Sequence, residues 1–502
     1  MSGGQALDRT LPTFEQVWEE LEKGMAFKRR IDLYETVKRN QDFFVGKQWE
    51  GVQANGLPTP VFNFIKRVVL YLVASTATDN LKLSASPLAG GGGEEVCRVV
   101  NGQFEALFEQ GKLGKHIREF MRRAAVDGDG CLYTWFDPRS ETGQTAKGTI
   151  RTELIENTRV VFGNPNSGDV QSQPYVLITR RERAGDVMAE GRQYGQSLEG
   201  LEGDTDETGS RTDALSGGNV TTVTRLWRRG EKIWGMKTVK GGLVRPAWDT
   251  GLRRYPIVWM SWDRVNGSYH GQAAVTGLIP NQIFVNKMFA MTMISLMTTA
   301  YPKVVYDRTR VAKWSSAVGQ AIAVNGGDMN TVARTIDAPA ISPQVGQFIQ
   351  LAIDLTKEFM GATDAALGNV RPDNTSAIIA LQKASAVPME LVRQELYQAV
   401  EDLGNIWLDM MGAYYGKRYV DGEIFDFARL RRVALSLKLD VGGSAYWSEI
   451  AQINTLDNLL RQGKITVVDY LERIPNGYIV DQQGLIEKLR QREGQSLMEG
   501  GV

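Results

Sequence analysis

A chain of 502 residues is too long for a single hydrophobic core, since such cores stop growing near about 250 to 300 residues. We therefore expect at least two packed regions. Its 42% hydrophobic and 23% charged residues exclude a disordered or fibrous protein. Lys and Arg together number 58, as do Asp and Glu, so the chain lacks the overall positive charge that is typical of a tight nucleic-acid binder.

Cysteine content and the first residues indicate the compartment. Cys97 and Cys131 are too few for a disulfide framework and fit a reducing environment. Residues 1–5 lack the basic and apolar regions of a signal peptide, so we expect synthesis in the cytoplasm. The best membrane candidate, 288–300, is much shorter than the roughly 20 apolar residues of a bilayer span, and we expect no transmembrane helix.

The first 270 residues mix two kinds of pattern, which predicts an α+β body. Helical periodicity covers 14–39, 62–77 and 96–125, and strand patterns cover 130–136, 150–154, 175–179 and 220–227. Residues 194–218 are almost all Gly, Ser, Thr, Asp and Glu, too polar to order themselves by burial. We expect a mobile surface insertion there, a solvated linker being favoured over a binding loop.

Next in the chain are two helices separated by a short β-rich segment. Residues 281–300 would form a helix about 30 Å long with apolar side chains on nearly every face, so it must be surrounded by protein. Neighbouring subunits could supply that surface. Residues 343–361 form an amphipathic helix, and 303–306 and 321–324 are the expected strands between the two helices.

A polar loop at 369–374 follows, so this part of the chain leads out from a body and back again. A long helix is expected from Asn374 or Thr375 to Met411, with a bend at Pro388, because proline lacks an N–H and its ring clashes with the preceding turn. Residues 433–441 alternate with period two and predict a strand.

The last part of the chain predicts a compact group of helices. The first covers 444–460 and ends at Gly463, and the last covers 482–491. Between them, Thr466 and Asp469 have the spacing of a capping box in which Asp replaces Glu.

Motifs for enzymatic chemistry are missing, so no catalytic, cofactor-binding or metal-binding residue is predicted. The string GxxxxGK[ST], which would hold a triphosphate, does not occur. Residues 127–130, Asp-Gly-Asp-Gly, resemble the start of a calcium loop, but Cys131 and Pro138 occupy ligand positions, and a tight turn is favoured. His116 is expected on a helix surface, and His270 in a structural role.

Two groups of residues have competing interpretations. For the methionine-rich helix at 281–300, plain packing within or between subunits is favoured over an adaptable binding surface. The basic run in the β-rich segment favours a solvated face, with a docking surface as the alternative. Its members are Arg308, Arg310, Lys313 and Trp314.

Several short strings, in this order and spacing, resemble segments of one family. They are residues 40–49, with an aromatic-Gly-x-Gln-Trp pattern, residues 61–66, with an Asn-x-Ile pattern, residues 124–136, Tyr269-His270-Gly271-Gln272, and Pro280-Asn281-Gln282 with Asn286. The chain therefore resembles the portal proteins of tailed bacteriophages and prophages, which form the ring at the capsid vertex where DNA enters and leaves. The family often has Ser-Gly after its tunnel loop, whereas this chain has Ser376-Ala377.

The resemblance implies a portal-like α+β subunit. Its parts would be a mixed wing (1–270), a first stem helix (271–300), a small β-rich clip (301–342), a second stem helix (343–364), a tunnel loop (365–376), a long kinked helix and strand returning to the wing (377–441), and a helical crown with the C-terminal tail (442–502). Residues expected to pack between subunits in the stem are Met288, Met291, Ile294, Met297, Phe348 and Leu355.

It also implies a function. The subunits would form a ring, typically of twelve, that serves as a non-sequence-specific channel for double-stranded DNA during packaging and ejection. Asn369, Arg371, Asp373 and Asn374 are expected to face the channel, with Arg371 nearest to phosphate. The clip would dock the terminase large subunit and later a head-completion or adaptor protein.

Further implied partners are the major capsid and scaffolding proteins. The ring would assemble in the host cytoplasm and remain in the virion, without a membrane or a cofactor. The alternatives are a minor capsid or scaffolding protein, or a packaging nuclease or ATPase. The missing motifs speak against the enzyme.

Overall fold

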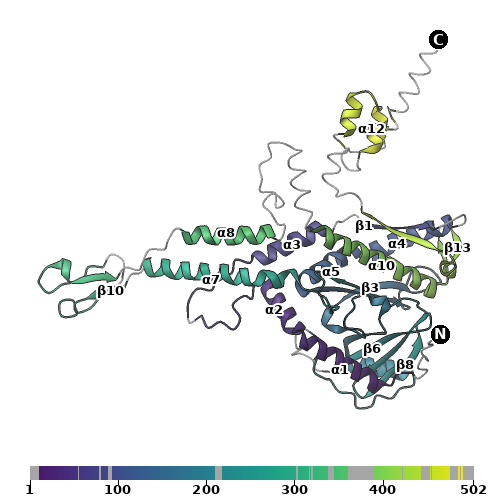
Figure 1. Ribbon diagram of the computed structural model, residues 1–502, viewed down its shortest axis with the longest axis horizontal. Helices are drawn as coiled ribbons and strands as arrows, with labels where there is room; N and C mark the ends of the chain where they lie inside the picture. The colour runs from purple at the N-terminus through teal and green to yellow at the C-terminus, as the bar shows by residue number, and fades with distance from the viewer. Residues whose placement is uncertain are drawn as a thin grey trace, which may run out of the picture.

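The computed structural model has an α+β body from which a pair of helices projects to one side (Figure 1). It describes residues 11–54, 56–77, 81–88, 93–209, 218–300, 303–315, 317, 320–336, 344–359, 389–420, 422–441, 453, 455–474, 484–486 and 488–489. The α+β class predicted from the sequence is confirmed.

Two of the predicted N-terminal helices are each divided in two. The helices are α1 (Phe14–Arg30), α2 (Leu33–Val45), α3 (Phe64–Thr76), α4 (Glu94–Gln110) and α5 (Leu113–Asp127). Asp32 separates α1 from α2 and Lys112 separates α4 from α5, with φ of 52° and 48°. Such left-handed residues end a helix, and the apolar periodicity that continues across them concealed both divisions.

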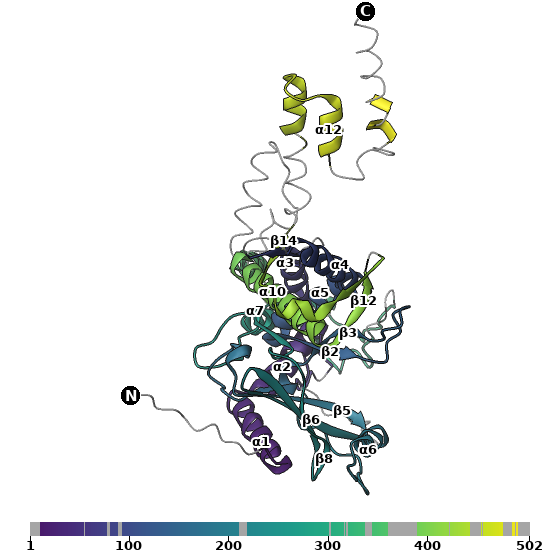
Figure 2. The same ribbon diagram turned by 90° about the vertical axis from the view of Figure 1, so that its right-hand side faces the viewer.

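A five-stranded antiparallel sheet forms the part of the body farthest from α8. Its order is β4 (Val160–Phe162), β5 (Tyr175–Arg183), β6 (Asn219–Arg229), β7 (Lys232–Val239) and β8 (Gly242–Asp249). Helix α1 lies along this sheet, burying Val17, Leu21 and Met25 against Val161, Leu177 and Val223 (Figures 1 and 2). A shorter helix, α6 (Ala184–Gln193), packs beside β8.

A second sheet of three strands links this unit to the remaining helices. Its order is β3 (Thr149–Ile155), β2 (Asp129–Asp137) and β9 (Ile257–Ser261). The four predicted strands are confirmed as β2, β3, β5 and β6, whereas β4, β7, β8 and β9 were missed. Gly235 in β7 lies under the Trp248 ring, and Pro246 is tolerated in β8 because that strand is at the sheet edge.

The longest helix of the body, α10 (Glu390–Tyr414), crosses the main core. Its Trp407 is buried against Phe104 and Phe108. The predicted period-two strand is confirmed as β14 (Leu435–Val441), which pairs with β1 (Leu81–Pro87), a strand that the sequence did not predict. A hairpin of β12 (Lys417–Val420) and β13 (Glu423–Asp426) lies between α10 and β14 in sequence.

The projection consists of α7 (Ala274–Ala300) and α8 (Gln344–Phe359), which lie side by side, and of the hairpin β10 (Lys303–Tyr306) with β11 (Ala333–Ile336) (Figure 1). The prediction of a strand at 321–324 is wrong, since β10 pairs with β11 instead. The intervening chain folds back around the buried Val311 and Val332, which leaves 321–324 without a strand partner.

Residues 194–209 are ordered against the body, so the prediction of a mobile insertion is wrong for this part. Leu198 and Leu201 pack on an apolar cluster beside α6, and Arg159 donates to the buried Asp206 at 2.6 Å. Arg181 pairs with Asp204. The segment is held by ion pairs with strand residues, which composition alone does not reveal. Residues 210–217 lie outside the described residues.

Helix α7 is longer than the apolar run 288–300 from which membrane spans were judged in the sequence. It has 27 residues, because the helix continues towards the N-terminus through Pro280, and by length and composition it is apolar enough to cross a bilayer. The expectation that the chain has no transmembrane helix therefore stays a prediction. The same criterion is met by helices that proteins bury, so it does not by itself indicate a membrane.

The predicted capping box is confirmed. Thr466 accepts a hydrogen bond from the backbone N–H of Asp469, whose carboxylate bonds back to Thr466, at the start of α12 (Val467–Arg473). Gly463, with φ of 65°, ends the preceding helix as expected. Pro388, all of 444–452, and residues 482, 483, 487, 490 and 491 lie outside the described residues.

Candidate functional site

The place where α7 leaves the body is fixed by the buried carboxylate of Asp129. It accepts hydrogen bonds from His270 Nδ1 at 2.7 Å, from the backbone N–H of Gly271 at 2.8 Å, and from Ser261 Oγ at 2.8 Å. Gly128 precedes it with φ of 98°, and a Cβ atom there would lie 2.7 Å from the Gly271 carbonyl oxygen. The Asp-Gly-Asp-Gly string is thus the turn between α5 and β2, as predicted.

Lys28 of α1 joins the same buried region. Its side chain is wholly buried, and Nζ donates to the carbonyl oxygens of Thr158 and Val160, both at 2.7 Å, and of Asn157 at 3.3 Å. Burial lowers the pKa of this ammonium to about 7, against the opposing attraction of Asp129. The three carbonyls hold α1 to the chain around β4.

His270 has the structural role expected for it. It is buried, and burial lowers its pKa below the usual 6.5 although Asp129 favours the charged form. His116 lies half-buried on α5. Within the part of the chain that the structure describes, no group of three His, Cys, Asp or Glu side chains could hold a metal ion.

Two buried amides of α7 bring together motif residues that are far apart in sequence. Gln282 accepts from the backbone N–H of Phe64 at 3.1 Å and donates to the Phe62 carbonyl at 2.9 Å. Asn286 donates to Gln48 Oε1 at 2.6 Å. These bonds attach residues 46–62, which we call the lateral loop, to the side of α7.

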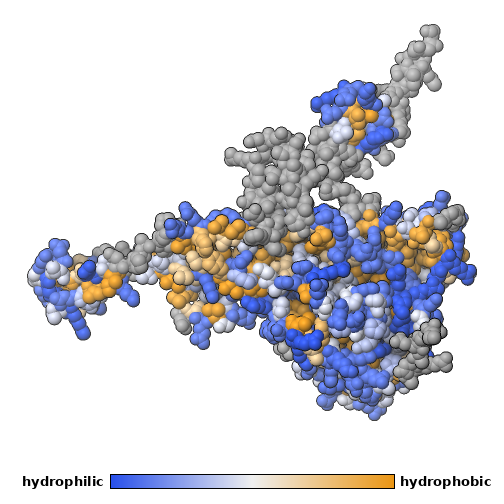
Figure 3. Space-filling model, viewed as in Figure 1, coloured by the Kyte–Doolittle hydropathy of each residue, from blue (hydrophilic) through white to orange (hydrophobic). Residues whose placement is uncertain are grey.

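Much of the projection is apolar and uncovered in the single chain (Figure 3). Of the residues predicted to pack between subunits, Met288 and Ile294 are half-buried, whereas Met291, Met297, Phe348 and Leu355 are exposed. Helix α8 turns Ile349 and Thr356 towards α7, with Asn281 donating to Thr356 Oγ1 at 3.0 Å. Phe348 lies edge-on to Phe284.

The β10–β11 module contains the predicted basic docking residues. Arg310 donates to the carbonyl oxygens of Gly326 and Asp328, both at 3.0 Å, and so holds the module's own chain together. Trp314 stacks on Tyr306, with ring centroids 5.4 Å apart. Arg308 and Lys313 are exposed. The predicted channel residues Asn369, Arg371, Asp373 and Asn374 lie outside the described residues.

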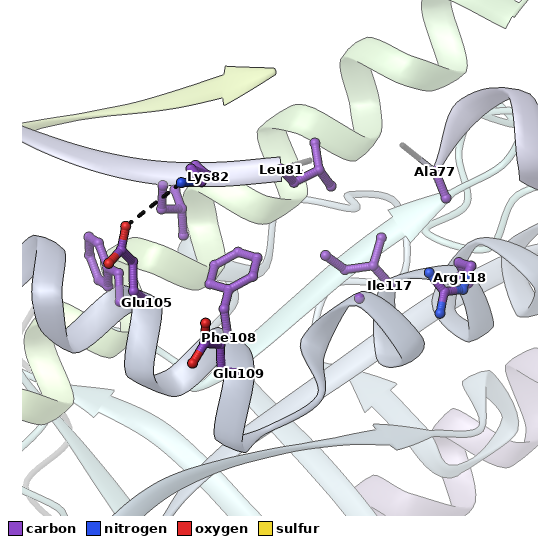
Figure 4. A pocket seen from close by; sticks show the side chains of 11 residues that line it. Ala77, Leu81, Lys82, Glu105, Phe108, Glu109, Ile117 and Arg118 are labelled. Carbon is purple, nitrogen blue, oxygen red and sulfur yellow. Dashed lines mark ion pairs between the residues drawn. The ribbon is translucent and has the colours of Figure 1, made fainter. Parts of the chain in front are cut away.

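A separate cavity of about 380 Å³ lies between α4, α5 and β1 (Figure 4). Apolar side chains such as Leu81, Phe108 and Ile117 line it, and Lys82 pairs with Glu105 at 3.9 Å on its rim. Its lining carries no arrangement typical of a catalytic site, and it is formed by body elements other than the projection.

The comparisons with known proteins agree with the fold. Residues 180–420 match the family model of phage P22-like portal proteins, a range that contains the projection and α10. No curated protein matches the chain.

The fold and this match support placing the chain among the structural components of bacteriophage capsids. More particularly, they support the identification of the chain as a phage portal protein, which confirms the resemblance seen in the sequence. This family is structural and not enzymatic, and it indicates an oligomer that assembles with capsid proteins.

The buried His270 makes stability depend on pH. Because its pKa in the folded protein lies below 6.5, the unfolded state binds more protons as the pH falls through 6.5, and the free energy of unfolding falls with it. We expect urea unfolding to show that the free energy of unfolding of the wild type falls between pH 7.5 and 5. In His270→Asn this fall should be smaller, by up to about 1.4 kcal/mol per pH unit.

Asp127, whose pKa is raised to about 6 by burial, and Lys28 titrate in both proteins and cancel in the difference. His116→Asn is the matched control, with a smaller effect because His116 is partly exposed. Equal pH dependence in the wild type and His270→Asn would contradict the assignment.

Gln282→Leu tests the attachment of the lateral loop. The change removes the buried hydrogen bonds of Gln282 to the Phe64 N–H, the Phe62 carbonyl and Asn286 Oδ1, so we expect unfolding to become about 2–4 kcal/mol easier. Proteases should also cut within 46–62 sooner. The exposed Lys287→Leu serves as the control on the same helix and should change stability little. If both variants behave alike, the amide contacts do not hold the loop.

Proposed function

We propose that this protein forms the ring at the unique capsid vertex through which double-stranded DNA is packaged and ejected. The observation that carries the proposal is the projection, whose apolar side chains the single chain leaves uncovered. Head-to-tail contacts give a closed ring when the rotation from one copy to the next divides a full turn evenly. Each copy then covers its neighbour's projection. The resemblance implies about twelve copies, with residues 271–300 and 343–364 as the stem.

The channel passes DNA without reading its sequence. Tight phosphate binding would oppose movement, since each neutralised phosphate adds affinity and salt dependence. A formal net charge of zero supports such weak binding. Arg371 in the tunnel loop (365–376) is the proposed phosphate contact, with Asn369, Asp373 and Asn374 beside it.

The tip of the projection is the proposed docking site for the terminase large subunit and later for a head-completion or adaptor protein. Arg308 and Lys313 are exposed there, whereas Arg310 is engaged within the module. We therefore assign charge recognition to Arg308 and Lys313, and a mainly positioning role to Arg310. ATP hydrolysis belongs to the partner, in agreement with a sequence that lacks a phosphate loop.

The other parts follow the same proposal. Residues 1–270 with 377–441 form the wing, 301–342 the clip, and 442–502 the crown. The wing faces the major capsid and scaffolding proteins during assembly in the host cytoplasm, and the finished ring stays in the virion. In the wing, Asp129 and its partners set the direction of the first stem helix.

The ring is tested by electron microscopy of the purified protein together with native mass spectrometry. We expect end-on rings with a central hole that admits a DNA duplex, at about twelve times the chain mass of 55.7 kDa. A defined dimer or a filament would refute the ring, and a minor capsid or scaffolding role would then replace it.

Replacing the proposed phosphate contact separates assembly from DNA handling. Arg371→Ala should leave rings intact and reduce the DNA that assembled particles retain, with a weaker salt dependence of retention because one cation per subunit is lost. Arg192→Ala, an exposed arginine on α6, is the control and should change neither property. Loss of rings in Arg371→Ala would show that the residue packs between subunits instead.

A further inference from the structure

The lateral loop leaves the body between α2 and α3 and lies along one side of α7 (Figure 1). Both of its ends are tied to α7 by the amides of Gln282 and Asn286. Within the loop, Trp49 Nε1 donates to the Pro60 carbonyl at 2.9 Å. The loop is therefore held in one place by buried polar contacts.

Held in this way, the loop presents apolar side chains to the solvent. Val52 and Leu57 are each 53% exposed, and Phe62 is 49% exposed. Several exposed apolar side chains on a loop that is held in place mark a contact site, because leaving them in water forfeits the hydrophobic free energy of covering them.

This surface continues onto the projection. The ring of Phe62 lies on that of Phe289, with centroids 4.1 Å apart, and the exposed Met293 follows one helical turn later. On α8 a second apolar row comprises the exposed Phe348, Leu351 and Leu355, whose spacing places them on one face. Figure 1 shows the lateral loop and α8 on opposite sides of α7.

The polar surroundings of the loop indicate what kind of partner covers it. Beside it is a groove between α2, the loop and α7, and the charged residues lining the groove balance one another. They are Asp32, Glu35, Asp42 and Glu50 against Lys38, Arg39, Lys47 and Lys287. DNA or an anionic membrane would be matched by basic residues alone, whereas an apolar centre with a mixed polar rim is typical of a protein interface.

We propose that the lateral loop of one subunit packs on the Phe348–Leu351–Leu355 row of the adjacent copy. The inference rests on the proposed ring and names a contact within it. Two different apolar faces on opposite sides of one projection are what a head-to-tail contact requires, since each copy then offers one face and receives the other.

Cysteine crosslinking tests the contact in the full-length protein. The double variant Val52→Cys with Leu351→Cys is treated with a short bismaleimide, and Leu57→Cys with Leu355→Cys is the second pair. The natural Cys97 and Cys131 are both buried and should not react. We expect covalent species of three or more chains up to the full ring, because every copy carries both partners of the contact.

Single variants and an off-site pair are the controls. Val52→Cys alone should give few crosslinks. Val52→Cys with Lys240→Cys, in the exposed turn after β7, should form no ladder, that is, no series of crosslinked species of increasing chain number. Native mass spectrometry of the same samples reports whether rings are present.

Each outcome separates this inference from the ring itself. Rings without a ladder in either pair would overturn the loop contact and leave the ring standing, whereas the absence of any oligomer would overturn both. Efficient dimers from Val52→Cys alone would indicate a two-fold contact and also overturn the proposal. Binding of the wild-type protein to lipid vesicles, prevented by Val52→Ser with Leu57→Ser, would assign the surface to a membrane.

Discussion

The buried carboxylate of Asp129 decides where the projection begins. It lies at the turn from α5 to β2 and accepts from both His270 and the backbone of Gly271, just ahead of α7. Lys28 holds α1 to the neighbouring carbonyls. A charged group in such surroundings is stable only when its partners are in place, so helix, sheet and projection are fixed to one another at a single point.

From that point α7 passes from a polar, buried and hydrogen-bonded environment into one that is apolar and open. Gln282 and Asn286 are buried near its start, and Met291 and Met297 are exposed towards its end. The same helix therefore belongs to the fold in one half and, in the proposed ring, to an assembly in the other. This division explains why the sequence is apolar on nearly every face of a helix that the single chain covers only in part.

Local signals made much of the fold predictable. The period-two pattern of β14, the Thr466–Asp469 capping box and the two projecting helices each depend on nearby residues, and each is confirmed. Breaks at Asp32 and Lys112 were missed because the apolar periodicity continues across them, and β8 was missed because it is an edge strand that contains Pro246. The segment 194–209 was misjudged because Arg159 and Arg181, distant in sequence, pair with its carboxylates.

The candidate site was less predictable, for a related reason. Gln48, Gln282 and Asn286 stood out as motif residues, but only the fold shows that they bond to one another and fix the lateral loop. Exposed Val52 and Leu57 carried no motif, since isolated apolar residues in a loop resemble many others. Exposure on a loop held by buried amides is a property of the folded chain alone.

The β10–β11 module has a consequence for the energetics of assembly. Among its described residues only Val311 and Val332 are buried, and Arg310 holds the backbone by hydrogen bonds. A unit with so little apolar burial gains small folding free energy of its own. Its order is therefore linked by mass action to contacts with other molecules, and protein concentration becomes a variable that sets how well the tip is folded.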